Sequence, residues 1–365
     1  MVSFTPTEDQ QLLIDTMRRY ALNEIRQIAH ESDEESTPQM SVVNTGWQMG
    51  LVPSAIPEEL GGFGEMSAIT GVLAAEELAF GDLSVAMHVM TPALFAYPVT
   101  LYGTPEQKET LLPMFLEESF APATAALLEP GVLFDAHNLK TTATAAGGKI
   151  TLNGTKAYVP LADNAEWLLV YARNAESGVT DGYIVKKDTP GVEIEKRELL
   201  MGLRALPTFR VRFTDVVVEE SARLGGAAGC DVNAILSRGQ VALAAMAVGV
   251  ARASYEYARD YAKERVQFGK PIAQNQAIAF MLAEMAIEVD SARLMAWEAA
   301  WKLDQGADAS AEAYLAKQYA DQMVLYVTDG GLQTLGGYGF IREYPVERWL
   351  RNGRGFPTFD GLAMV

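Results

Sequence analysis

Few residues in this 365-residue chain have the types and spacing that common catalytic sites require. The three histidines, His30, His88 and His137, are widely separated, so we expect core or surface positions rather than a base or metal ligand. The sequence contains no G-x-S-x-G elbow, H-E-x-x-H helix or phosphate-binding loop. A glycine cluster at 336–339 follows a predicted helix, which argues against a dinucleotide-binding βαβ unit. The cluster is typical of a helix end, although glycines there also let a ligand approach the backbone.

The composition narrows the classes of protein further. Hydrophobic residues make up 49% and charged residues 21%, which is ordinary for a globular chain of two or three domains. Lys plus Arg total 29 against 47 Asp plus Glu, and this balance argues against nucleic-acid or anionic-membrane binding. The single cysteine, Cys230, excludes an intramolecular disulfide and a cysteine-cluster metal site. Because we see no export signal and no apolar run of 18 residues, we expect a cytoplasmic protein without a membrane span.

The elements that would position a site fall into three zones. Residues 1–120 are predicted to form an N-terminal α-helical domain. Its first helix should start near Pro6-Thr7-Glu8, and its apolar stripe should comprise Leu12, Leu13, Met17, Tyr20 and Ala21. Residues 121–228 contain short β-branched and aromatic runs between turn residues, which predicts a middle antiparallel β domain. Within that zone, Leu152-Asn153-Gly154 is a candidate hairpin turn.

Residues 229–365 return to long alanine-rich helical periodicity. The pattern predicts a C-terminal four-helix bundle, with two of its helices near 308–335 and 343–352. The expected fold class is therefore α+β: helical, β, helical.

Two long motifs in the last zone resemble the acyl-CoA dehydrogenase family. They are YAKERVQFGKPIAQNQAIAFMLAEMA and QTLGGYGFIREYPVERWLRNGRGFPTFDG. The resemblance extends in order and domain pattern over the whole chain, more loosely in the first 120 residues. In the β zone, EPG at 129–131 and LNGTKAYV at 152–159 fall where the family has flavin-contacting motifs, which places Leu128 and Tyr158 beside the cofactor. The resemblance implies a flavoprotein oxidoreductase that uses FAD and an acyl-CoA substrate in fatty acid or steroid catabolism.

The family's remaining cofactor contacts come from a neighbouring subunit. By this resemblance, Arg265, Phe268 and Gln276 reach the FAD of that neighbour, with the Arg265 guanidinium suited to the pyrophosphate. Gln333, Gly336 and Gly337 match a second contact at the adenosine end. The resemblance thus implies a homotetramer or a heterotetramer with a related subunit, and an electron-transferring flavoprotein as the usual electron acceptor.

Asp360 stands where the family keeps its catalytic base, usually a glutamate. It lies 17 residues after Glu343 without a gap, and Gly361 follows it as in the family. The implied chemistry is removal of the α-proton of an acyl thioester while a hydride leaves the β-carbon for flavin N5. An apolar neighbour such as Phe359 would raise the pKa of the carboxyl and make it a better base. The resemblance also places Phe359 and Gly361, together with Arg238 near the CoA-binding helix, at the substrate.

Several positions depart from the family's pattern. Leu128 and Phe134 stand where hydroxyls usually meet the cofactor, and Pro160 removes a donor near flavin N5. Gln240 replaces an expected arginine, and Leu362 replaces a threonine. Three hypotheses follow: an active FAD enzyme with an Asp base, a flavin-poor subunit that completes a partner's FAD site, or a non-dehydrogenase that uses the fold for binding.

Overall fold

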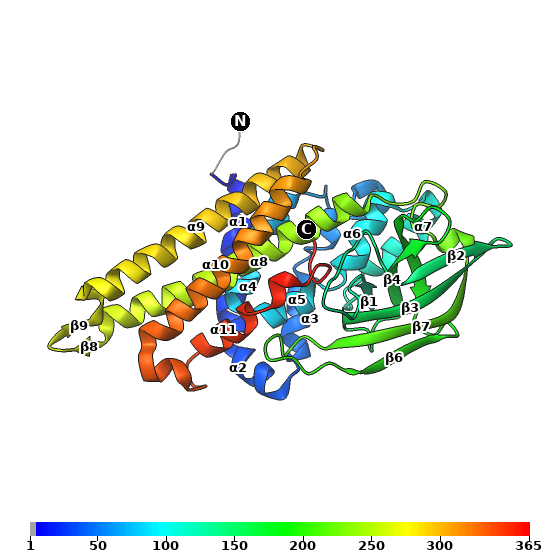
Figure 1. Ribbon diagram of the computed structural model, residues 1–365. Coiled ribbons are helices and arrows are strands. Elements are labelled where there is room, and N and C mark those ends of the chain that lie inside the picture. Colours follow the sequence, from blue (N-terminus) through cyan, green and yellow to red (C-terminus); the bar gives the residue numbers. More distant parts are fainter. Residues whose placement is uncertain (1–4) are drawn as a thin grey trace.

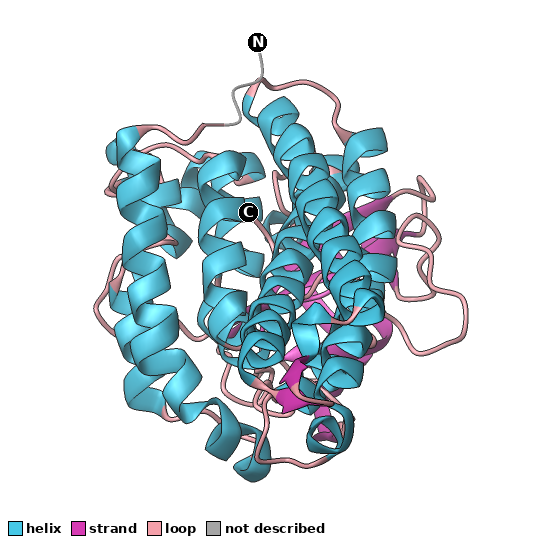
Figure 2. Cartoon of the chain, turned by 90° about the vertical axis from the view of Figure 1, so that its left-hand side faces the viewer, coloured by secondary structure: helices cyan, strands magenta, loops and turns pink. Residues whose placement is uncertain are grey.

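The computed structural model describes residues 5–365, and helices, sheet and helices follow one another along the chain (Figure 1). The predicted α+β fold with helical, β and helical zones is confirmed. A view along the long helices shows the strands behind them, so the sheet packs at one end of the helical body (Figure 2). The N-terminal helices are α1 Glu8–Tyr20, α2 Arg26–Glu35, α3 Met40–Gln48, α4 Ala68–Gly81, α5 Leu83–Met90, α6 Ala93–Tyr102 and α7 Pro105–Leu111.

The first helix starts where its capping residues predict. Thr7 is the N-cap of α1 and forms a reciprocal capping box with Gln10. The predicted apolar stripe of α1 is only partly right: Met17 and Tyr20 are buried, but Leu12 is 65% exposed. Ile14 takes a place in the core instead, because the buried face of α1 is set by the helices packed against it.

The β zone forms one seven-stranded sheet, ordered β1-β4-β2-β3-β7-β6 with β5 paired to β4. The predicted antiparallel pairing holds for β4 with β5 but is wrong for β4 with β1 and β2, which pair with it in parallel. The chain between β4 and each of these two parallel partners is long enough for a crossover connection. The strands are β1 Ala123–Ala126, β2 Thr142–Ala146, β3 Lys149–Pro160, β4 Trp167–Asn174, β5 Thr180–Lys186, β6 Val192–Arg197 and β7 Thr208–Glu219.

The predicted hairpin turn at Leu152-Asn153-Gly154 is also wrong. Strand β3 continues through these residues, and its register with β7 shifts between Leu152 and Gly154. The turn between β2 and β3 is made by Gly147 and Gly148, whose φ angles are 60° and 78°. Two successive positive φ angles suit a two-residue hairpin turn, so this glycine pair marks the turn.

The C-terminal helices are α8 Val232–Glu264, α9 Gln276–Asp304, α10 Ser310–Leu335 and α11 Val346–Gly353. Helix α8 is capped by Asp231. It is long and apolar enough to cross a membrane, but 83% of its apolar window is buried inside the protein, as expected of a core helix. The short strands β8 Val266–Gln267 and β9 Lys270–Pro271 form an arm between α8 and α9.

Buried ion pairs connect α4 to three other helices. Glu76 and Glu77 of α4 accept hydrogen bonds from Arg252 of α8 at 2.5 and 2.9 Å. Arg293 of α9 also reaches Glu76, and Arg18 of α1 reaches Glu77. These carboxylates and guanidiniums pair with one another, as groups of this kind must when they are removed from water.

Candidate active site

Asp360 lies at the point where the chain turns from the surface into the helical core. It follows the short 3-10 helix η8 Phe356–Thr358 and precedes Gly361, whose φ is +82°. A Cβ at position 361 would lie 2.9 Å from Leu127 Cδ2, so both the conformation and the packing require glycine. The Asp360-Gly361 pair therefore has a structural reason that is independent of any family pattern.

One buried lysine is shared between Asp360 and a second carboxylate. Lys317 Nζ, on α10, lies 3.7 Å from Asp360 Oδ1 and 3.7 Å from Asp321 Oδ2. The Lys317 side chain is only 6% exposed and that of Asp360 24% exposed. The Oδ1 atoms of both aspartates are buried and accept no hydrogen bond within the described chain. Asp360 Oδ1 is thus held only by an ion pair that is longer than a hydrogen bond, so it can accept a hydrogen bond from a bound molecule.

Burial controls the proton affinity of both carboxyls. It raises the pKa of Asp360 above its usual value, while Lys317 and the Gln240 amide act in the opposite direction. Burial also raises the pKa of Asp321 to about 6; Lys317 partly opposes this, and the Asp360 carboxyl adds to it. A carboxyl whose pKa is raised is a stronger base once it is ionised.

An aromatic pair lies next to Asp360. The rings of Tyr158 and Phe359 are stacked, with centroids 4.5 Å apart and an interplanar angle of 29°. Tyr158 has a φ of 54°, a strained value for this residue type, and its main-chain N–H donates to Glu198 Oε2 at 2.9 Å. The structure thus brings together four of the predicted site residues, Tyr158 of strand β3 and Phe359, Asp360 and Gly361 of the C-terminal segment.

The first flavin-like motif of the β zone has a structural role in this chain. Glu129 accepts the main-chain N–H groups of Lys140 and Thr141, and it also binds the fully buried Lys156 Nζ at 3.0 Å. Leu128 is buried, and its carbonyl accepts the N–H of Ala157. Residues 128–129 therefore anchor the loop to β3, and the Glu129 carboxylate is already engaged by protein donors.

A second group of predicted residues lies on the arm side of the helices. Arg265, Gly336 and Gly337 line one hollow of about 530 Å³ together with Tyr338. A Cβ on Gly336 or Gly337 would meet nothing within 4 Å, so both leave space for a ligand. Phe268, at the tip of the arm, is 95% exposed.

Gln276 and Gln333 are exposed as well, and the two groups of predicted residues do not meet within one chain. The arm lies at one end of the long helices and the sheet at the other, with the Asp360 segment beside the sheet (Figure 1). A site that used both groups would need two chains.

Arg238 lies away from solvent. It is 8% exposed, and its Nη1 donates to the main-chain oxygen of Val365 at 3.0 Å. In this structure Arg238 therefore binds the chain's own C-terminal segment.

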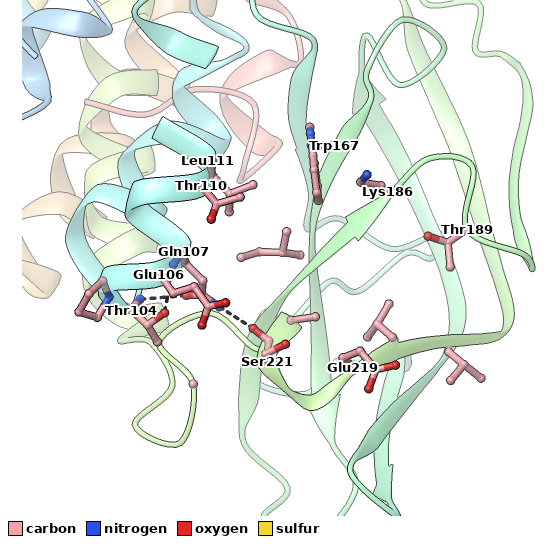
Figure 3. Close-up of a pocket in the computed structure, with 16 residues that line it drawn as sticks. Thr104, Glu106, Gln107, Thr110, Leu111, Trp167, Lys186, Thr189, Glu219 and Ser221 are labelled. Carbon is pink, nitrogen blue, oxygen red and sulfur yellow. Dashed lines mark hydrogen bonds between the residues drawn. The ribbon is translucent and has the colours of Figure 1, made fainter. Parts of the chain in front are cut away.

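A separate hollow of about 800 Å³ lies between α7 and the sheet (Figure 3). It is lined by residues such as Gln107, Trp167 and Glu219 and contains none of the predicted site residues. Sequence reasoning also did not anticipate the roles of Lys317, Asp321 and Glu198. The i, i+4 spacing of Lys317 and Asp321 predicts a helix-surface ion pair, but nothing local links it to Asp360.

The comparisons with known proteins agree with this geometry. Residues 7–119, 124–216 and 231–363 match the N-terminal, middle and C-terminal domains of acyl-CoA dehydrogenase. An acyl-CoA dehydrogenase of Bacillus subtilis (strain 168) is 33% identical over 366 residues, covering 98% of this chain and 96% of that protein. A 3-(aryl)acrylate reductase of Clostridium sporogenes is 35% identical over 369 residues, covering 98% and 96%.

Solved structures are similar over almost the full length. The butyryl-CoA dehydrogenase of Megasphaera elsdenii has a TM-score of 0.90 at 30% identity and covers 100% of this chain and 96% of that chain. The FAD complex of PigA has a TM-score of 0.89 at 25% identity and covers 99% and 96%. Fold, site and relatives define a flavoprotein oxidoreductase. The chain belongs to the acyl-CoA dehydrogenase family, whose members carry out FAD-dependent dehydrogenation of acyl-CoA-like substrates.

Family membership assigns FAD to the chain as its cofactor. The residues of the chain fit the nucleotide end and the ring end of FAD differently. At the arm, Arg265 and the open backbone at Gly336 and Gly337 suit a phosphate-bearing nucleotide. At the sheet, Tyr158 offers an aromatic face, but its N–H is occupied by Glu198 and Pro160 has no N–H. The ring end would therefore be held mainly by apolar and aromatic contact.

Proposed function

We propose that the chain catalyses α,β-dehydrogenation of an acyl-CoA thioester, with Asp360 as the base that removes the α-proton. The observation that supports this most directly is the buried Asp360 Oδ1, which accepts no hydrogen bond in the described chain and lies beside the Tyr158–Phe359 pair. The 3.7 Å between Lys317 Nζ and Asp360 Oδ1 is longer than a hydrogen bond, so this oxygen can take up a proton while Lys317 stays in place.

Each residue near the site has a defined part in this proposal. The carboxylate of Asp360 takes the α-proton, the Cα–H bond breaks, and its electron pair forms the double bond to the β-carbon. Lys317 holds the carboxylate in place, and the aromatic pair keeps water away from it. Bound FAD supplies the acceptor for the hydride that leaves the β-carbon.

The base assignment is tested by Asp360→Asn, with Asp321→Asn as the matched control. We expect Asp360→Asn to abolish reduction of bound FAD by butyryl-CoA while the FAD content per chain stays unchanged. Asp321→Asn should retain turnover, because Asp321 binds Lys317 and is not beside the aromatic pair. Retained turnover in Asp360→Asn, or loss only in Asp321→Asn, would show that Asp360 is not the base.

A second function is favoured by the contrast between the two ends of the cofactor site. Pro160 and the occupied N–H of Tyr158 weaken the ring end, whereas the hollow at Arg265 is open. This contrast suits a flavin-poor subunit of a hetero-oligomer that completes the FAD site of a related chain. Absorbance of the purified protein separates the two functions. About one FAD per chain supports the enzyme, whereas colourless protein that acquires FAD only with a related subunit supports the second function.

The proposed assembly follows from the separation of the two groups. We propose an oligomer, homomeric or with a related subunit, in which the arm of one chain meets the sheet side of another. The proposed electron acceptor is an electron-transferring flavoprotein, and the proposed location is the cytoplasm.

A further inference from the structure

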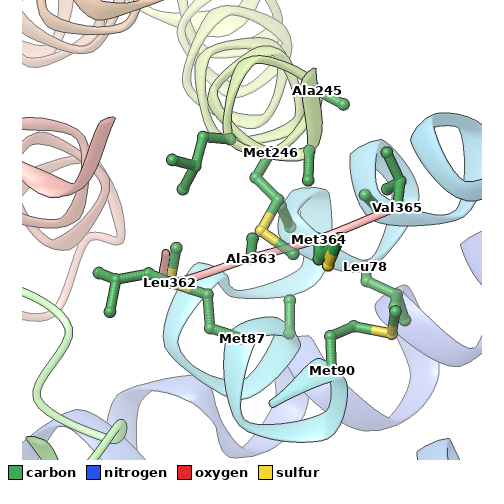
Figure 4. Close-up of a cluster of buried hydrophobic side chains, with 14 of the residues drawn as sticks. Leu78, Met87, Met90, Ala245, Met246, Leu362, Ala363, Met364 and Val365 are labelled. Atoms are coloured by element: carbon green, nitrogen blue, oxygen red, sulfur yellow. The ribbon is translucent and has the colours of Figure 1, made fainter. Parts of the chain in front are cut away.

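The segment immediately after the proposed base is buried in the helical core. Leu362, Ala363, Met364 and Val365 are each only 2–3% exposed. The segment passes between α8 on one side and α4 and α5 on the other (Figure 4). It thus occupies the space that opens inward from Asp360.

Glycines on the flanking helices mark a groove shaped around this segment. A Cβ on Gly71 of α4 would lie 2.7 Å from Val365 Cβ, closer than real Cβ contacts come. A Cβ on Gly239 of α8 would lie 3.2 Å from the carbonyl oxygen of Ala363. The hydrogen bond from buried Arg238 to Val365 adds a polar contact. The segment therefore has a fitted place between the two helices.

The segment also separates two cavities. On the Asp360 side, Gly361, Ala363 and Met364 line a cavity of about 20 Å³, which holds about one water molecule. Beyond it, Val365, Met90 and Tyr97 line a cavity of about 220 Å³ under α4 and α6. The segment thus lies between the small cavity, which Gly361 lines next to Asp360, and the larger one.

The side chains around the segment, between the two cavities, are apolar and flexible. Met87, Met90 and Met246 surround Met364 in the same cluster (Figure 4). Methionine side chains are flexible and polarizable and can adjust to ligands of different shape. Without the side chains of Met364 and Val365, this path would suit a straight aliphatic chain.

We propose that the segment Leu362–Val365 sets the acyl specificity of the site, with Met364 and Val365 as the residues that limit acyl length. The site accepts a short acyl group between Asp360 and the aromatic pair and rejects a chain that must extend past Met364. This inference rests on the proposed function, because it assumes that the acyl thioester lies at Asp360.

The test compares butyryl-CoA and octanoyl-CoA on the FAD-loaded wild type and on Met364→Ala/Val365→Ala. Two quantities are measured: the calorimetric Kd of each thioester and the rate at which it bleaches the flavin absorbance. We expect the wild type to prefer butyryl-CoA. In the double variant, the Kd for octanoyl-CoA should improve about tenfold or more, as expected when a pocket gains room for several methylenes, with little change for butyryl-CoA. Met17→Ala, an equally buried methionine on α1, is the matched control and should change neither Kd.

The outcomes separate this inference from the proposed function. Equal octanoyl-CoA binding in the wild type and the double variant, or equal wild-type affinity for both thioesters, would overturn the length limit even if both reduce the flavin. Tighter octanoyl-CoA binding in the variant without flavin reduction by either thioester would support the length limit and count against the dehydrogenase. If the double variant does not fold, the single variant Val365→Ala, measured in the same way, decides between the same outcomes.

Discussion

At the scale of single residues, one positive charge is divided between two carboxyls. Lys317 lies at the same 3.7 Å from Asp360 and from Asp321, and Gln240 of α8 also faces Asp360. Lys317 and Gln240 lower the pKa of Asp360, against the raising effect of burial. The protonation of the proposed base therefore depends on residues that need not touch a substrate.

The substitution Lys317→Met should change the pH dependence of the proposed base. Loss of the ammonium removes a contribution that lowers the pKa of Asp360, so that pKa should rise further above its usual value. Because only the ionised carboxyl can act as base, the acidic limb of the rate of FAD reduction should move to higher pH. The rate at which butyryl-CoA bleaches the flavin absorbance is measured from about pH 5 to about pH 9, because a general base works best near neutral pH.

Lys317→Arg serves as the control, since it keeps the positive charge. Its acidic limb should stay close to that of the wild type. A limb that does not move in Lys317→Met, or that moves to lower pH, would contradict the tuning role.

At the scale of elements, charged residues connect helices that come from different parts of the chain. Arg252 of α8 binds Glu76 and Glu77 of α4, and its own side chain is only 10% exposed. Burial raises the pKa of Glu77, but hydrogen bonds from Arg252 and Arg18 outweigh it and hold that pKa below its usual value. This contribution to stability is therefore present above the ordinary glutamate pKa and is lost as the pH falls through the lowered value.

The element-scale prediction is a large destabilisation in Arg252→Met. The substitution leaves two buried carboxylates with fewer partners, which costs about 3–5 kcal/mol of unfolding free energy. Urea unfolding at neutral pH measures it. Arg259→Met, on the same helix but more exposed and paired with Asp260, should change stability by less than about 0.5 kcal/mol. Equal effects of the two substitutions would show that the buried pairs do not connect the helices energetically.

At the scale of the whole molecule, the two halves of the candidate cofactor site lie at different ends of one chain. The residues around Asp360 are beside the sheet, whereas Arg265 and the glycines 336–337 are near the arm (Figure 1). Within residues 5–365, no carboxylate forms an ion pair with Arg265, and its guanidinium lies 5.4 Å from the Tyr338 ring centroid. The charge is thus available to a partner molecule.

The whole-molecule prediction is that Arg265→Ala loses FAD. Removing one charge-assisted contact to a phosphate should weaken the FAD Kd about 10–100-fold. The ratio of flavin to protein absorbance after gel filtration measures this loss. Arg259→Ala, an arginine on α8 that pairs with Asp260, is the control and should keep its flavin. Full flavin retention in Arg265→Ala would show that Arg265 does not contribute to FAD binding.

Features that depend on neighbouring residues can be predicted from the sequence. Capping and periodicity place α1 at Thr7-Glu8 and predict the order of helical, β and helical zones, because helix starts and strand patterns are encoded locally. The motifs of the last zone identify the family and place Asp360 before Gly361. The structure adds a packing reason for that glycine.

Contacts between residues that are far apart in the sequence follow from the packing of whole elements. The parallel pairing of β4, the approach of Lys317 to Asp360 and the burial of Leu362–Val365 each join segments that are tens of residues apart. No local pattern predicts such contacts, because they depend on how whole helices and strands pack. Packing also determines what surrounds Asp360: a shared lysine, an aromatic pair and the chain's own apolar segment.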